Sequence, residues 1–229
     1  MKKSVMIGGI VVVLLVAILA FAFLREPESA SEPIAAVPIS ETAGETSLGA
    51  EGATLFQISS ADSEVRFQLD EDLRGNRVTV VGRTDQVAGE ISLDLNNLSA
   101  TQVGVIQINA RTLATDNNMR NRALSNQILD TGSYEYITFT PTAVNGLPAT
   151  ASVGNTVSFT IDGDLTIRDV TSPATFTVEA TVVSATQISG TATSVVTRET
   201  YGLTIPNVPN VANVEDEVEL TIDFVANAS

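Results

Sequence analysis

The chain of 229 residues contains no cysteine, no histidine and no tryptophan. Without cysteine it cannot form disulfides, a thiolate nucleophile or a cysteine-ligated zinc site. Without histidine it lacks the usual general base near pH 7 and the commonest ligand of transition metals. Together these absences remove most of the side chains on which enzymes commonly depend.

Basic residues are also scarce, because 12 lysines and arginines stand against 27 aspartates and glutamates, for a formal charge of −15. A protein with this charge repels the phosphate backbone, so no nucleic acid partner is expected. The only lysines are Lys2 and Lys3, and every later basic residue is an arginine. Charge and composition change along the chain and divide it into three segments.

The first segment, residues 1–24, contains an uncharged apolar run of twenty residues, 5–24. As a helix this run spans roughly 30 Å, the thickness of a bilayer's hydrocarbon core. We therefore expect a transmembrane signal anchor. Because Lys2 and Lys3 favour the cytoplasmic side, we expect a single-pass protein whose C-terminal domain is periplasmic or extracellular. A cleaved signal peptide is the alternative, with Ser29-Ala30-Ser31 as a candidate cleavage sequence.

The second segment, residues 25–52, holds three prolines, three glycines and six glutamates but no aromatic residue. Such a composition buries too little apolar surface to offset the entropy lost on ordering. We expect an acidic, Pro- and Glu-rich disordered linker.

The third segment, residues 53–229, is dominated by alternation of apolar and polar residues, as in 64–69, 87–95, 157–167 and 218–224. A period of two with many valines and threonines is typical of β-strands that bury one face. Only residues 117–127 depart from it, with Met119, Ala123 and Leu124 at helical spacing. The pattern predicts an all-β, antiparallel barrel or sandwich with one short helix.

Two short motifs resemble known sites, but neither has all the residues that the site requires. The sequence Asp130-Thr131-Gly132-Ser133 resembles an aspartic protease loop, yet that chemistry needs two such loops and the chain has one. We interpret it as the turn after the helix. The run Asp70 to Gly75 begins like a calcium loop, but Arg74 stands at a ligand position. No metal site and no cofactor are predicted.

Arg198 allows two interpretations. It could meet an anionic head group, or it could pair with a neighbouring carboxylate, which is the commoner role of such a residue.

Several stretches, in the right order from about Thr54 to Ala226, resemble the YceI-like family of lipid- and polyisoprenoid-binding domains. The similarity is carried by FQISSADSEVRFQL (56–69), TLATDNNMRNRALSNQILDTGSYEYITFTPT (112–142), GDLTIRDVTSPATFTV (163–178), TRETYGL (197–203) and VEDEVELTIDF (214–224). The family's usual polar residues are replaced at Asp62, Asn121 and Ala123.

The resemblance implies a lipocalin-like β-barrel enclosing an apolar tunnel for an isoprenoid or other long-chain lipid, such as a quinone or a polyprenol. The departures imply that head-group recognition in this chain either differs from that of the family or is lost. Inward positions on the predicted strands provide the candidate lining: Phe67, Val80, Ile91, Ile108, Phe139, Phe159, Leu165, Phe176 and Leu203.

We expect no catalysis, because the acidic residues fall mostly on the outward positions of strands, as at Glu64, Glu90, Asp162 and Glu179. The alternative to lipid binding is a structural or adhesive cell-surface domain whose core is filled by its own side chains. Association as a homodimer is left open.

Overall fold

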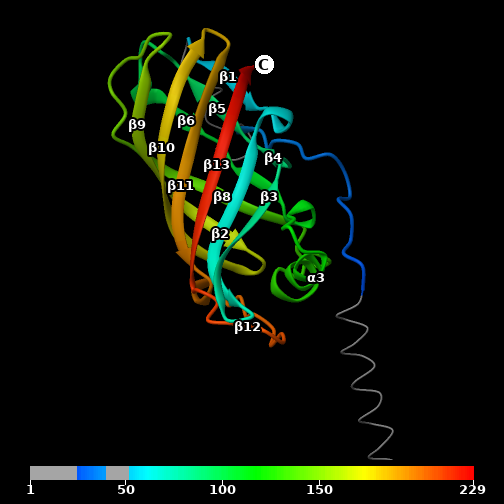
Figure 1. Ribbon diagram of the computed structural model, residues 1–229. Helices are drawn as coiled ribbons and strands as arrows, with labels where there is room; N and C mark the ends of the chain where they lie inside the picture. Colours follow the sequence, from blue (N-terminus) through cyan, green and yellow to red (C-terminus); the bar gives the residue numbers. More distant parts are fainter. Residues whose placement is uncertain (1–24, 40–51) are drawn as a thin grey trace, which may run out of the picture.

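The computed structural model describes residues 25–39 and 52–229, which form a strongly curled antiparallel sheet with a short helical segment at one end (Figure 1). The sheet contains thirteen strands in this part of the chain. They are β1 (Thr54–Ile58), β2 (Glu64–Leu73), β3 (Asn76–Thr84), β4 (Val87–Ala88), β5 (Glu90–Leu93), β6 (Gln102–Val103), β7 (Ile106–Asn109), β8 (Tyr136–Asn145), β9 (Thr156–Ile167), β10 (Val170–Ser184), β11 (Gln187–Thr197), β12 (Val211–Ala212) and β13 (Glu217–Ala228).

The pairing order explains the curl of the sheet. Strands pair in the order β4-β7-β8-β9-β10-β11-β13-β1-β5-β6, and every pairing is antiparallel. β4 and β5 are separated only by Gly89, so this path returns close to its start. Along the edge of β13 that faces away from β11, the second half pairs with β1 and the first half pairs with β2. β2 in turn pairs with β3 and β12. The predicted antiparallel β class is confirmed, and the sheet has the shape of a half-barrel.

Side-chain alternation places one face of each strand inside the curl. On β9, Ile161, Leu165 and Ile167 are buried, whereas Asp164 between them is exposed. The long strands β9, β10 and β11 therefore present apolar side chains inward and threonines outward, as the period of two predicts.

The one predicted helix is confirmed, although it is less regular than expected. α3 (Asn118–Ala123) continues directly into the π-helical turn η4 (Leu124–Ile128). The side chain of Asn117 caps α3 by accepting hydrogen bonds from the backbone N–H groups of Met119 and Arg120. Four 3₁₀ turns also occur in the described residues: η1 (Ser60–Asp62), η2 (Leu98–Ala100), η3 (Ala110–Thr112) and η5 (Glu199–Tyr201).

The sequence Asp130-Thr131-Gly132-Ser133 forms the turn after this helical segment. Asp130 has φ of +46°, and its carbonyl accepts hydrogen bonds from the N–H groups of Ser133 and Tyr134. The backbone reversal explains the motif without a catalytic role.

The acidic residues at the β2–β3 hairpin share one arginine as their partner. Arg77 forms ion pairs with Asp70, Asp72 and Glu215. Within residues 25–39 and 52–229, no three acidic side chains come together in a way that would hold a metal ion.

The predicted membrane span lies outside the described residues. Among the residues that are described, no helix is long and apolar enough to cross a bilayer. Of the predicted linker, residues 25–39 follow the surface of the domain and contact it at several points, whereas residues 40–51 fall outside the description (Figure 1).

Candidate ligand-binding site

Two cavities occupy the inside of the curled sheet. We call the end that carries α3 and β12 the lower end, as it lies in Figure 1, and name the cavities accordingly. The lower cavity has a volume of about 380 Å³ and the upper cavity about 100 Å³. Binding pockets for small molecules typically measure about 300–1,000 Å³, so the lower cavity has the size of a ligand site.

The upper cavity is almost wholly apolar. Its walls come from β5 to β11 and β13. They include the edge-to-face pair of Phe139 and Phe176, whose ring centroids are 4.9 Å apart. A dry cavity of about 150 Å³ is enough to hold a benzene ring. The upper cavity is therefore large enough for only a small part of a lipid chain.

The lower cavity is enclosed by three parts of the fold. β2, β3 and β13 form one wall, α3 and η4 form a second, and the loop of residues 203–214 forms the third. Its rim carries the exposed residues Arg74, Asn117, Met119 and Asn210. The apolar lining includes Phe67, Leu69, Leu73, Val80, Leu113, Ala123, Leu124, Ile128, Ile137, Ile167, Leu203, Ile205, Val208, Val214, Val218 and Leu220.

The two cavities lie end to end along the same strands. On β8, Ile137 lines the lower cavity and Phe139 lines the upper one. On β13 the same division falls between Leu220 and Ile222. Alternate residues on a strand are only about 6.8 Å apart, so a single layer of side chains separates the cavities.

One buried ion pair lines the lower cavity. Glu71, whose side chain is 8% exposed, accepts a hydrogen bond of 3.0 Å from the guanidinium of Arg120. Arg120 also pairs with Asp116 at 2.6 Å. The pair provides a polar end to a pocket that is otherwise mainly hydrophobic.

Arg198 has a structural role in the loop that covers the lower cavity. It donates hydrogen bonds to the carbonyls of Leu203, Val214 and Glu215, and it lies 3.8 Å from a carboxylate oxygen of Asp216. Beside it, burial raises the pKa of Tyr201, so the phenol stays protonated at neutral pH. Arg198 thus closes the loop of residues 203–214 onto the sheet.

The structure distributes the nine predicted lining residues over three places. Ile91, Phe139, Phe159 and Phe176 line the upper cavity, and Phe67, Val80 and Leu203 line the lower cavity. Ile108 and Leu165 are buried in the core and line neither cavity.

Glu71, Arg120 and the covering loop were not among the predicted site residues. Glu71 falls on the inward positions of β2, in step with Phe67 and Leu69, and this alternation was the available signal. Glu90 was expected to face solvent, but it is buried, because Gln57 and the backbone N–H of Ile39 both donate to its carboxylate.

A model of the YceI-like domain matches residues 56–226, so the chain belongs to the YceI-like domain family. The resemblance seen in the sequence is thereby confirmed. The family consists of binding domains and is non-catalytic, which also confirms that the domain is not an enzyme. None of the curated proteins compared with the chain matches it.

Three solved structures share the fold at low sequence identity. A polyisoprenoid-binding domain from Saccharophagus degradans, implicated in plant cell wall breakdown, has a TM-score of 0.61 and 16% identity over 76% of this chain and 98% of its own. BcnA of Burkholderia cenocepacia has a TM-score of 0.59 and 18% identity over 74% and 99%. The YceI protein of Campylobacter jejuni has a TM-score of 0.52 and 16% identity over 65% and 84%.

Proposed function

We propose that the protein binds an isoprenoid-type lipid, such as a quinone or a polyprenol, inside its curled sheet and carries or stores it without chemical change. The observation that supports this proposal is the end-to-end arrangement of two apolar cavities along the same strands. A long, thin and apolar ligand is the class of molecule that fits such an interior.

In the bound state the two cavities form one tunnel, and the sheet acts as a lipocalin-like barrel. Only the layer between Ile137 and Phe139 on β8, and its counterparts on the other strands, separates the cavities. A change of side-chain rotamer in that layer would join them. Burial of the chain would contribute about 25 cal/mol per Å² of apolar surface before the cost of ordering the ligand.

The head group lies at the Glu71–Arg120 pair in this proposal. The carboxylate of Glu71 accepts the hydrogen bond of Arg120 through Oε1. No other group in the described part of the chain bonds to its second oxygen, which can accept a hydrogen bond from a hydroxyl group on the ligand. A neutral, hydroxyl-bearing head group could donate a hydrogen bond to this carboxylate.

We also propose that residues 5–24 attach the protein to the membrane and that the domain lies on the periplasmic or extracellular side. The uncharged apolar run and the position of Lys2 and Lys3 support this topology.

The test combines lipid analysis with two matched variants, in each of which an alanine is replaced by phenylalanine. Organic extracts of the purified protein are analysed by mass spectrometry, and binding of isoprenoid alcohols of increasing length is titrated. Ala123→Phe fills the lower cavity and should abolish binding at every length. Ala192→Phe fills the upper cavity and should weaken binding of long chains while sparing short ones.

Circular dichroism of both variants provides the folding control. Absence of any lipid in the extract, together with no binding of added isoprenoids by the wild type, would overturn the proposal. The domain would then be the structural or adhesive module considered from the sequence.

A further inference from the structure

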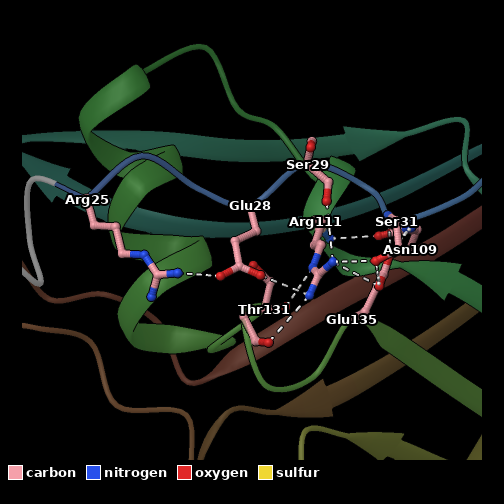
Figure 2. Close-up of polar contacts among 9 residues, drawn as sticks. Arg25, Glu28, Ser29, Ser31, Asn109, Arg111, Thr131 and Glu135 are labelled. Carbon is pink, nitrogen blue, oxygen red and sulfur yellow. Dashed lines mark hydrogen bonds and ion pairs between the residues drawn. The ribbon is translucent and has the colours of Figure 1, made fainter.

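The segment of residues 25–39, which we call the strap, is fastened to the domain by a partly buried cluster of polar groups (Figure 2). At its centre is Arg111, whose side chain is only 11% exposed. Its guanidinium pairs with Glu135 of the domain at 3.0 Å and with Glu28 of the strap at 3.1 Å. It also donates to the hydroxyl of Ser31 at 2.8 Å.

Glu135 completes the cluster from the other side. Its carboxylate accepts hydrogen bonds from the backbone N–H of Ser31 at 2.8 Å and from the Ser31 hydroxyl at 2.7 Å. The side chain of Asn109, which is wholly buried, donates to it at 3.0 Å. Hydrogen bonds to charged groups are stronger than neutral ones, so this cluster is the main fastening of the strap.

The strap has a fixed direction along the domain. At its beginning, the carbonyl of Arg25 accepts a hydrogen bond of 2.7 Å from Asn126 on η4, the element that forms one wall of the lower cavity. At its far end, the N–H of Ile39 donates to Glu90 on β5 at 3.0 Å. The residue that follows the apolar run 5–24 is therefore held at the lower end of the domain.

This attachment changes how far the domain can stand from a membrane. A free linker of residues 25–52 could extend over about 90 Å and would allow every orientation of the domain. With Arg25 held at η4, almost none of that length lies between the apolar run and the lower end.

The lower end also presents apolar groups around the cavity rim. Met119 on α3 is 48% exposed. The adjacent loop of residues 203–214 contributes Ile205, Pro206, Val208 and Val211, which are all partly exposed and line the cavity. Apolar residues around an opening are suited to contact with a lipid surface.

We propose that the strap holds the lower end of the domain against the bilayer, so that the lower cavity opens directly onto membrane lipid. This proposal rests on the membrane attachment proposed above but does not require that any isoprenoid is bound. The partner of the lower end is thus the lipid surface itself.

The absence of cysteine from the chain makes a site-specific test straightforward. Met119→Cys labels the lower end, and Val153→Cys labels an exposed apolar position near the upper cavity, where Gly154 bonds to Val182. Each full-length variant carries a fluorophore and is reconstituted in phosphatidylethanolamine–phosphatidylglycerol vesicles that contain a lipid with a spin-labelled head group. Quenching of the fluorophore reports its distance from the bilayer.

The main fastening of the strap is then weakened without changing the domain. The double variant Glu28→Ala and Ser31→Ala removes the strap's side chains from the cluster. The matched control, Ser29→Ala with Glu32→Ala, changes the same residue types in the same segment, and Ser29 contributes only its backbone carbonyl to Arg111.

We expect quenching several-fold stronger at position 119 than at 153, retained in the control and lost in the Glu28/Ser31 variant. Equal quenching at both positions in the otherwise wild-type chain would overturn the proposal. So would a difference that persists in the Glu28/Ser31 variant. A chain that does not float with the vesicles would refute the membrane attachment itself, whereas failure to bind isoprenoids would leave the quenching result unaffected.

Discussion

The aromatic ring of Phe67 covers Gly82, the residue directly opposite it on β3. A methyl group added to Gly82 would lie only 2.1 Å from a ring carbon of Phe67. The absence of a side chain at Gly82 therefore allows the ring to lie against the backbone of β3, where it lines the lower cavity. The shape of the lower cavity therefore depends on the glycine at position 82.

Gly82→Ala should displace Phe67 and destabilise the domain by about 1–3 kcal/mol, the usual cost of overfilling a packed site. Urea unfolding followed by circular dichroism measures the change. Gly132→Ala is the control, because the nearest atom to its added methyl lies 3.5 Å away, an ordinary contact. Equal unfolding midpoints for Gly82→Ala and the wild type would contradict the packing argument.

Phe139→Ala should merge the two cavities, because Phe139 borders the upper cavity next to Ile137 of the lower one. We expect a loss of about 3–5 kcal/mol in stability and a shift of binding preference toward longer isoprenoid chains. Phe56→Ala is the control, since Phe56 is equally buried but lines neither cavity. A similar shift in chain-length preference for both variants would show that Phe139 does not divide the interior.

The attachment of the strap should depend on pH. Burial raises the pKa of Glu135, but the hydrogen bonds from Ser31 and Asn109 and the charge of Arg111 outweigh burial and leave the pKa below its ordinary value of 4.5. Release of the strap removes the bonds from Ser31, so the pKa of Glu135 is higher in the released state. Attachment is therefore strongest above the pKa of Glu135 in the released state, and it weakens as the pH falls through the lowered pKa of the attached state.

Hydrogen exchange or limited proteolysis of residues 25–39 between neutral pH and pH 3 measures this release. Arg25, Glu28 and Arg111 are the other charged groups of the cluster. Glu135→Gln should remove the pH dependence of protection in the strap, measured as the exchange rate relative to the intrinsic rate at the same pH. A dependence that persists unchanged in that variant would show that Glu135 is not the group responsible.

Asn117→Ala should loosen α3 by about 0.5–2 kcal/mol, because two backbone N–H groups lose their acceptor. α3 forms part of the wall of the lower cavity, so we expect faster amide exchange in residues 118–124 and faster release of bound lipid. Asn118→Ala, one position into the helix, is the matched control. Identical exchange rates in the two variants would argue against the cap.

The sheet could be predicted from sequence because alternation reveals which face of a strand is apolar. That pattern does not reveal what covers the opposite face. Glu90 lies on an outward position as predicted, yet it is buried, because the strap passes over it and Ile39 bonds to its carboxylate. A segment rich in proline and glutamate has no periodicity that would predict such an attachment.

The sequence predicted that the inward face of the sheet is apolar. It did not predict how the interior is divided into two cavities and a packed core. Inward positions such as Phe139 and Leu165 belong to the same apolar face, and only their packing decides that one borders a cavity and the other lies in the core. Glu71 was identifiable from its place on the inward alternation of β2, although its partner Arg120 is 49 residues away in sequence.

The pairing of β1 with β13 has a consequence for how the chain folds. Phe56 in the first strand lies opposite Ala228 in the last, so this seam cannot form until β13 has been synthesised. Pairing over such a sequence separation is slow, on the order of milliseconds to seconds. Until then, the edges of β1 and β11 stay unpaired and open to association with other chains. Late closure of this seam therefore extends the time during which two strand edges of the unfinished sheet are exposed.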